Sequence, residues 1–231
     1  MSAVAEKPVV EILPLVAGDR LTRKEFERRY EAMPHVKKAE LIERIVYMSS
    51  PVRSKQHGKP HFKIISWLGA YTAATPGVEG DDNSSLRLDM DNEPQPDAAL
   101  TIAPEHGGQA QVDEDGYLTG APELIAEVAA SSASYDLHDK LNAYRRNGVK
   151  EYLVWRVLED KVDWFVLRDG NYARLEPDSS GLIKSEVFPG LWLDASALIE
   201  GDTAQLAQKL QDGLNSKEHA EFARKLAKHD G

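Results

Sequence analysis

Residues 121–131 read APELIAEVAAS, and the fold prediction starts from this run. It is short and apolar, as a buried β-strand is, yet it carries Glu127 near its centre. An earlier apolar run, PDAALTI at residues 96–102, also carries an acidic residue, Asp97, at its start. A carboxylate in a buried strand is costly unless it is paired or bound to a metal ion. The two runs therefore predict strands that bring two carboxylates to one point.

Each of these carboxylates also has an ordinary explanation. Asp97 follows a proline and could be a turn or strand-entry residue. Glu127 shares a face with Glu123 and Ile125, so it could face solvent on a half-exposed strand. As a pair they suit Mg²⁺, which takes oxygen ligands and is usually held by one or two carboxylates plus waters.

The sequence on either side predicts a mixed sheet with helices packed on it, an α/β (α+β) architecture. After the Glu127 strand, residues 135–146 form a helix that Asn147-Gly148 ends, and residues 151–158 and 162–167 form a hairpin. Before the Asp97 strand, Thr22 and Glu25 resemble a capping box for a helix over residues 23–33. A first strand covers 40–48, a basic loop covers 51–58, a helix follows Pro60, and residues 84–89 form a short strand.

The sequence also predicts that two acidic segments are loops and that the C-terminal region is helical. Residues 79–82 and 113–115 have the composition of solvated loops. From about Thr203 the sequence predicts one appended amphipathic helix with Leu206, Leu210 and Leu214 four residues apart. We expect an N-terminal extension at 1–20, one domain at 21–200 and this helix within 201–231.

The composition excludes several classes of protein. The 231 residues contain no cysteine, so disulfides and thiolate metal sites are impossible. No apolar run approaches the length of a membrane span, and the N-terminus lacks the apolar core of a signal peptide. We therefore expect a cytoplasmic protein that does not associate with membranes.

The net charge of −10 argues mildly against a nucleic-acid partner, but the positive charge is concentrated locally. A first cluster lies in the first helix, and a second lies close to His57 and His61. Such clusters could contact phosphates, or they could be solvated surfaces. Their members are Arg20, Arg23, Lys24, Arg28 and Arg29 in the first cluster, and Arg53, Lys55, Lys59 and Lys63 in the second.

A hydrolytic site also needs a group that orients water or offsets charge on the transition state. Lys140 is a candidate, because it lies 13 residues after Glu127 in the following helix. The alternative is a surface ion pair with Asp136 at i, i+4, and spacing alone favours that alternative.

Four segments in order resemble the Uma2-like (DUF820) family of metal-dependent nucleases. They are Pro96-Asp97, AEVAAS at 126–131, D-x-x-x-K at 136–140 and YRRNGVKEYLVW at 144–155. AELIERIVYMSSP at 39–51 with His57, and FPGL at 188–191, are also similar to family segments. The resemblance extends over about Leu21 to Leu198.

The resemblance implies a PD-(D/E)XK restriction-endonuclease-like core and a Mg²⁺- or Mn²⁺-dependent endonuclease acting on DNA. It implies that Asp97 and Glu127 are metal ligands and that Lys140 is a migrated catalytic lysine, because Ala129 occupies the usual lysine position. Glu40 would be an additional acidic residue, as a metal ligand or a water partner, with Glu43 as a nearby competitor.

The resemblance also suggests a DNA-contacting role for His57, next to the basic residues Arg53, Lys55 and Lys59. Two features depart from the family pattern: Arg44 replaces a glycine, and Pro60 follows His57 closely. Two symmetric sites that cut the two strands of a duplex suggest a homodimer. The leucine stripe could form its interface or fold back on its own domain. The alternative function is an inactive nuclease-fold protein that binds DNA or assembles with partners.

Overall fold

A six-stranded mixed sheet forms the centre of the computed structural model, which describes residues 11–48, 53–130 and 132–229. The elements are α1 (Arg23–Glu31), β1 (Ala39–Ile42), β2 (Ile45–Met48), η1 (Ser54–Gly58), α2 (Lys59–Ala74), β3 (Val78–Asp82), β4 (Leu86–Arg87), β5 (Ala98–Ile102), η2 (Pro104–His106), β6 (Gln111–Val112), β7 (Leu118–Thr119), β8 (Leu124–Ala129), α3 (Ala133–Tyr135), η3 (Asp136–Lys140), α4 (Leu141–Asn147), β9 (Glu151–Arg156), η4 (Val157–Glu159), β10 (Lys161–Arg168), β11 (Asn171–Arg174), β12 (Leu182–Lys184), β13 (Trp192–Asp194), α5 (Ala195–Glu200), α6 (Thr203–Leu214), α7 (Lys217–Leu226) and η5 (Ala227–His229).

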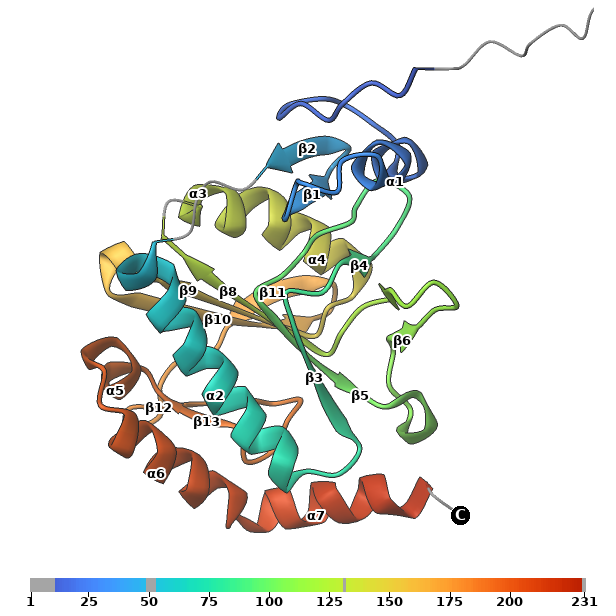
Figure 1. Cartoon of the computed structure of the whole chain (residues 1–231). Helices are drawn as coiled ribbons and strands as arrows, with labels where there is room; N and C mark the ends of the chain where they lie inside the picture. The colour runs from blue at the N-terminus through green and yellow to red at the C-terminus, as the bar shows by residue number, and fades with distance from the viewer. Residues whose placement is uncertain (1–10, 49–52, 131, 230–231) are drawn as a thin grey trace, which may run out of the picture.

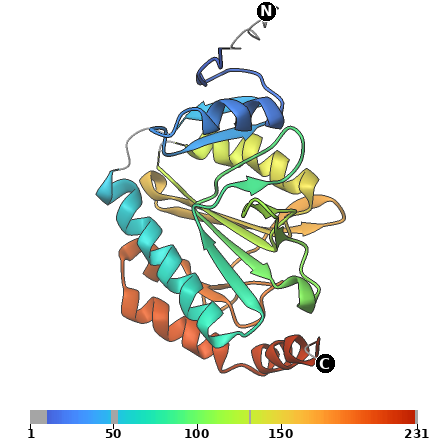
Figure 2. The same cartoon turned by 45° about the vertical axis from the view of Figure 1, so that its right-hand side comes forward.

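The central strands lie in the order β11-β10-β9-β8-β5-β3. β8 and β9 pair in parallel, and the other neighbours in this sheet pair antiparallel. Helices cover both faces of the sheet: α2 and α6 lie on one side, and α3 and α4 lie on the other (Figures 1 and 2). The predicted mixed α/β fold is confirmed, as is the β9–β10 hairpin.

Side-chain alternation along the strands divides the core into two layers. Leu124 and Val128 of β8 pack in the cluster that contains α2 and α6. Ile125 and Ala129 pack in the opposite cluster, which contains Tyr144 of α4. Glu127 lies between Ile125 and Ala129 in this alternation, so its side chain is on the α4 side of the sheet.

A smaller cap of α1, β1 and β2 lies beyond α4 (Figure 1) and has its own apolar cluster. The prediction of a single strand over residues 40–48 is wrong, because β1 and β2 are antiparallel strands of a tight hairpin. Glu43 and Arg44 form its turn with φ of 52° and 65°. Two consecutive positive φ values allow a two-residue hairpin turn, but glycine or asparagine normally marks it.

Two other segments upstream of β5 differ from the prediction. The acidic residues 79–82, predicted as a loop, lie in β3, which pairs with β5 at the edge of the sheet. Charged residues are common on edge strands because they discourage pairing with other chains. The predicted basic loop is wrong over residues 54–58, which form a π-helical turn leading into α2; residues 51–52 lie outside the described residues.

The first helix ends at Glu31, and its predicted capping box does not form. Thr22 is the N-cap residue, but its side chain makes no capping hydrogen bond. The Glu25 carboxylate instead accepts bonds from the guanidinium groups of Arg28 and Arg29. Arg23 pairs with Glu27, so much of the basic charge of this helix is neutralised within the chain.

The C-terminal region forms two helices, α6 and α7, where the sequence predicted one. Gly213 packs so closely on Gly190 that a Cβ atom added to Gly213 would lie 2.2 Å from the Gly190 carbonyl oxygen. Ser216 is then the N-cap of α7, and its side chain accepts a hydrogen bond from the His219 N–H. Leu206 and Leu210 are buried in the main core, so the leucine stripe folds back on its own domain. No helix in the described part of the chain is long and apolar enough to cross a membrane.

Glu93 provides a test of the packing between the cap and the sheet. It is 2% exposed, and burial together with a hydrogen bond to Glu27 raises its pKa to about 8. Because the pKa is raised in the folded state, the neutral form stabilises the fold, and this contribution is lost as the pH rises from about 5 to 8. Glutamine does not titrate, so the free energy of unfolding of Glu93→Gln should fall less than that of wild type over this pH range. We expect the difference to be on the order of 1 kcal/mol.

The measurement is urea denaturation of both proteins at pH 5.5 and pH 8. Glu105→Gln, at an exposed position, is the control and should keep the wild-type pH dependence. An unchanged pH dependence in Glu93→Gln would contradict this assignment.

Candidate functional site

The two predicted carboxylates lie next to each other in the fold: Glu127 is in β8, and Asp97 immediately precedes the adjacent strand β5. β5 and β8 pair with Ala98 opposite Ala126, so continuing this register places Asp97 opposite Glu127. Both residues are 3% exposed. Two buried acids at neighbouring positions repel each other, so each requires compensating positive charge or hydrogen-bond donors.

Asp97 receives that compensation from three directions. Its Oδ1 lies 3.3 Å from the Lys38 ammonium, while its Oδ2 lies 3.1 Å from Nε2 of His57 and accepts the Val128 N–H at 2.8 Å. Burial alone would raise the pKa of Asp97, but the contacts with His57, Lys38 and Val128 outweigh it. The pKa therefore lies well below its usual range, and Asp97 is ionised.

Glu127 accepts two hydrogen bonds at the same oxygen. Lys140 Nζ lies 2.8 Å and the Tyr144 hydroxyl 3.0 Å from its Oε1. Lys140 and Tyr144 are four residues apart, so they lie on one face of the helical segment. Burial raises the pKa of Glu127 to about 8, and nearby carboxylates including Asp97 add to the effect, against the lowering influence of Lys140.

Lys140 is enclosed by carboxylates rather than exposed at the surface. It is 2% exposed, and its Nζ lies 2.8 Å from Glu127, 2.8 Å from Glu40 and 3.8 Å from Asp136. Burial lowers the pKa of Lys140, but the three acids outweigh burial and raise the pKa well above its ordinary value. Lys140 is therefore a fixed ammonium ion. The alternative of a surface pair with Asp136 is wrong, because both groups are buried and the Asp136 contact is the longest of the three.

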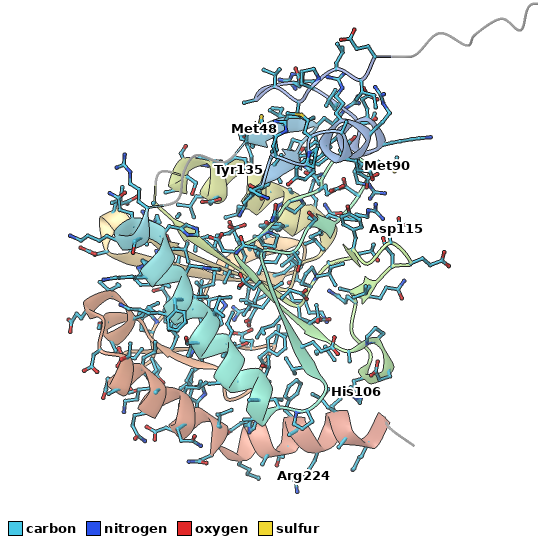
Figure 3. All side chains as sticks on the ribbon, viewed as in Figure 1. Met48, Met90, His106, Asp115, Tyr135 and Arg224 are labelled. Carbon is cyan, nitrogen blue, oxygen red and sulfur yellow. The ribbon has the colours of Figure 1, made fainter. Side chains whose placement is uncertain are left out.

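The local backbone helps to place Lys140. Residues 136–140 form the π-helical turn η3 between α3 and α4. π-Helical turns inside helices are common at functional sites, because the additional residue changes which side chains face inward. The Lys140 ammonium also lies 5.4 Å from the centroid of the Tyr135 ring, and this ring packs against Tyr47 of β2 at an interplanar angle of 33°. Figure 3 shows Tyr135 in the same region as Met48, at the end of the cap hairpin.

Glu40 reaches the site from β1, whereas its competitor Glu43 does not. The Glu40 Oε1 atom accepts the Gln95 N–H at 2.7 Å and contacts Lys140. Glu43 lies in the hairpin turn and pairs with Arg146 at the surface. The cap therefore contributes one carboxylate to the site.

The site carries more negative than positive charge. Four buried carboxylates, Asp97, Glu127, Glu40 and Asp136, face two ammonium groups, Lys38 and Lys140. With all four carboxylates ionised, four negative charges would face two positive ones, and a divalent cation would balance that difference and favour the ionised form of Glu127. Among the described residues, no group of three or more His, Asp or Glu side chains could by itself hold a metal ion. Asp97 and Glu127 still fit Mg²⁺ or Mn²⁺, because these ions need only one or two carboxylates beside water.

Basic residues surround the Asp97 side of the site. Arg53, Lys55 and Lys59 are exposed and lie in or next to η1, the turn that brings His57 to Asp97. His61, one turn into α2, contacts the Asp97 carbonyl oxygen at 2.9 Å. Trp67, Tyr71, Trp155 and Trp164 are buried, and Trp192 is partly buried, so these aromatic rings belong to the packing of the core.

Sequence reasoning missed the contributions of Lys38, Tyr144 and Asp136. Tyr144 could have been found because it lies one helical turn after Lys140. Lys38 could have been found because it lies two residues before Glu40 and therefore on the same side of an extended segment. The sequence indicates Asp136 only as a surface partner of Lys140 and as the first residue of the D-x-x-x-K segment.

Comparison with known proteins agrees with this arrangement of elements. A sequence model of the Uma2 family, described as "Putative restriction endonuclease", matches residues 23–196, which is more than half of the chain. A crystal structure of a "putative nuclease belonging to DUF820" from Anabaena variabilis ATCC 29413 has a similar fold, with a TM-score of 0.57 and 14% sequence identity. The similarity covers 75% of this chain and 96% of that one, and none of the curated proteins matches this chain. The chain belongs to the Uma2 family.

Proposed function

We propose that this protein is a divalent-metal-dependent endonuclease that hydrolyses DNA phosphodiester bonds. The observation that carries the proposal is the pair of buried carboxylates, Glu127 in β8 and Asp97 just before the paired strand β5, with the Lys140 ammonium at 2.8 Å from Glu127. A protein keeps such an acid-rich interior at a cost in stability, so a functional role is the best explanation for it.

In this proposal Asp97 and Glu127 hold Mg²⁺ or Mn²⁺. When bound, the ion supplies positive charge at the scissile phosphate and eases deprotonation of the attacking water. Tyr144 and Lys140 fix the orientation of the Glu127 carboxylate through their two hydrogen bonds. The Val128 N–H fixes Asp97 in the same way.

Lys140 acts as a donor, because its raised pKa keeps it protonated. Its ammonium orients the attacking water and offsets negative charge on the transition state. Glu40 is held by the Gln95 N–H and can serve as a second ligand or as a hydrogen-bond partner of the water.

The DNA backbone would lie along the basic turn next to His57. Arg53, Lys55 and Lys59 are exposed there and can contact phosphates without reading the bases. A homodimer is part of the proposal, since two symmetric sites can cut both strands of a duplex. The leucine stripe is not available as the interface because Leu206 and Leu210 are buried in the chain's own core.

Two observations favour a second candidate, a nuclease-fold DNA-binding or assembly module without activity. Ala129 stands at the usual position of the catalytic lysine, and both oxygens of Asp97 already have partners within the chain. Such a protein would bind DNA but would not cleave it in any metal ion.

Plasmid cleavage distinguishes the two candidates. We expect the purified protein to nick or linearise supercoiled plasmid in Mg²⁺ or Mn²⁺ and to be inactive in EDTA. Asp97→Asn, which keeps the shape and can still accept the Val128 N–H, should be slower by about 1,000-fold or more because charge stabilisation at the phosphate is lost.

Asp212→Asn on the exposed side of α6 is the matched control and should cleave at the wild-type rate. Absence of cleavage by the wild type in both metal ions, together with retained DNA binding, would favour the inactive module. Equal cleavage by Asp97→Asn and wild type would remove Asp97 from the site.

A further inference from the structure

Lys38 is a charged group within the site that the proposed reaction does not use. It immediately precedes β1, and its Nζ lies 3.3 Å from Asp97 Oδ1 and 3.4 Å from Asn83 Oδ1. Its side chain is 22% exposed, in contrast to 3% for Lys140. The carboxylates of Glu40, Asp97 and Glu127 together outweigh the effect of burial and raise the pKa of Lys38. Lys38 is therefore an ammonium ion on the solvent-accessible side of the carboxylates.

Asp97 already has three partners, and a metal ion at its Oδ1 atom would compete with the Lys38 ammonium. The Val128 N–H is a backbone donor of the adjacent strand and accounts for one bond to Oδ2. Lys38 occupies Oδ1 through a long contact, and it is a flexible side chain that already reaches solvent. His57, at Oδ2, is similarly exposed, so Lys38 and His57 are the two partners that can leave with little change in the fold, and Lys38 is the one at Oδ1. A divalent cation at Asp97 would also repel the ammonium strongly at this distance.

We propose that Lys38 is a displaceable counter-cation of the metal site. Its ammonium neutralises Asp97 and the neighbouring carboxylates while no metal ion is bound, and it moves toward solvent when a divalent cation enters. Lys38 thereby stabilises the metal-free fold and weakens metal binding. This inference rests on the proposed metal site at Asp97 and Glu127.

A purely structural role for Lys38 makes a different prediction. A lysine that only anchors β1 would stabilise the protein equally with and without metal ion, and its loss would leave metal affinity unchanged or reduced. A counter-cation stabilises only the metal-free state. Its loss should therefore lower stability without metal ion and increase the stabilisation that metal ion provides.

The experiment measures Mn²⁺ binding by calorimetry and thermal unfolding with and without Mn²⁺, in the full-length protein without DNA. We expect Lys38→Met to bind Mn²⁺ about tenfold more tightly than wild type or better, because one nearby positive charge is lost. Its Tm should be below wild type without metal ion and should rise more on addition of Mn²⁺. Lys37→Met, at the adjacent exposed position, removes the same charge and should behave as wild type.

A second measurement needs no variant and remains valid if Lys38→Met does not fold. Acetylation of the wild-type protein, followed by mass spectrometry, should show a higher rate at Lys38 relative to Lys37 when Mn²⁺ is present. An unchanged ratio, with Mn²⁺ binding demonstrated, would overturn the inference.

The remaining outcomes separate this inference from the proposed function. If wild type and Lys38→Met bind Mn²⁺ equally and Asp97→Asn does not, the metal site stands and the counter-cation role is overturned. Weaker binding by Lys38→Met also overturns it. If wild type and Lys38→Met both fail to bind Mn²⁺, the proposed metal site and the inference fall together.

Discussion

Lys140→Met is expected to reduce DNA cleavage by about 100- to 1,000-fold, the effect of removing one positioned donor that offsets charge on the transition state. The variant leaves Glu127, Glu40 and Asp136 buried without their shared cation. Without metal ion, the free energy of unfolding should fall by about 3–5 kcal/mol, as when one partner of a buried ion pair is removed. Cleavage must therefore be measured in saturating Mn²⁺, after circular dichroism has shown that the variant is folded.

Metal binding distinguishes a catalytic role of Lys140 from a structural one. Lys140 is not a ligand, so Lys140→Met should bind Mn²⁺ at least as well as wild type while failing to cleave. Lys140→Arg should restore little activity, because a bulkier guanidinium must fit where the side chain is 3% exposed. Lys225→Met on α7 is the exposed control. Wild-type cleavage by a folded Lys140→Met would show that Lys140 has no catalytic role.

The sequence predicted the acidic residues of the site, because each lies in a run where apolar residues are expected. Glu127 interrupts a run of apolar residues, and only a pairing partner makes such a position acceptable inside a strand. The strands and the helix that follows them were also predicted, because their residue patterns are local in the sequence. The register that places Asp97 opposite Glu127 depends on strand pairing, which the sequence does not specify directly.

The features that were missed depend on contacts between distant segments. Lys38 meets Asp97 across 59 residues of sequence, and Glu40 meets Gln95 across 55. The break between α6 and α7 follows from the close approach of Gly213 to Gly190, which neither segment reveals alone. The Glu43–Arg44 turn lacks the residues that usually mark a tight hairpin, so the sequence predicts one strand where the structure has two. In each case tertiary packing overrides the local pattern.

Glu127→Gln should separate charge from shape at the centre of the site. A glutamine oxygen can still accept the hydrogen bonds of Lys140 and Tyr144, so we expect the fold to be kept. The neutral amide is a poor ligand for a hard cation, and it cannot ionise to offer a metal ion a negative charge as Glu127 can. Cleavage should fall by about 1,000-fold or more, and Mn²⁺ should bind about tenfold more weakly or not at all.

Stability should change in the opposite direction to activity. Burial raises the pKa of Glu127 to about 8, so ionising this carboxylate reduces the stability of the metal-free protein as the pH rises toward 8. Glutamine does not titrate, so Glu127→Gln should lose less stability than wild type between pH 5.5 and pH 8. Urea denaturation in EDTA at the two pH values measures this difference.

Glu151→Gln provides the matched control for Glu127→Gln. Glu151 is also a buried glutamate at a strand position, and burial raises its pKa to about 7, but its partners are Ser185 and the backbone N–H groups of Glu186 and Val187. We expect Glu151→Gln to alter stability while leaving Mn²⁺ binding and cleavage at wild-type levels. If Glu127→Gln binds Mn²⁺ and cleaves as wild type does, Glu127 is not a ligand. If both variants are folded but neither cleaves, cleavage depends on buried carboxylates of this sheet in general, and the loss in Glu127→Gln is not the loss of a metal ligand.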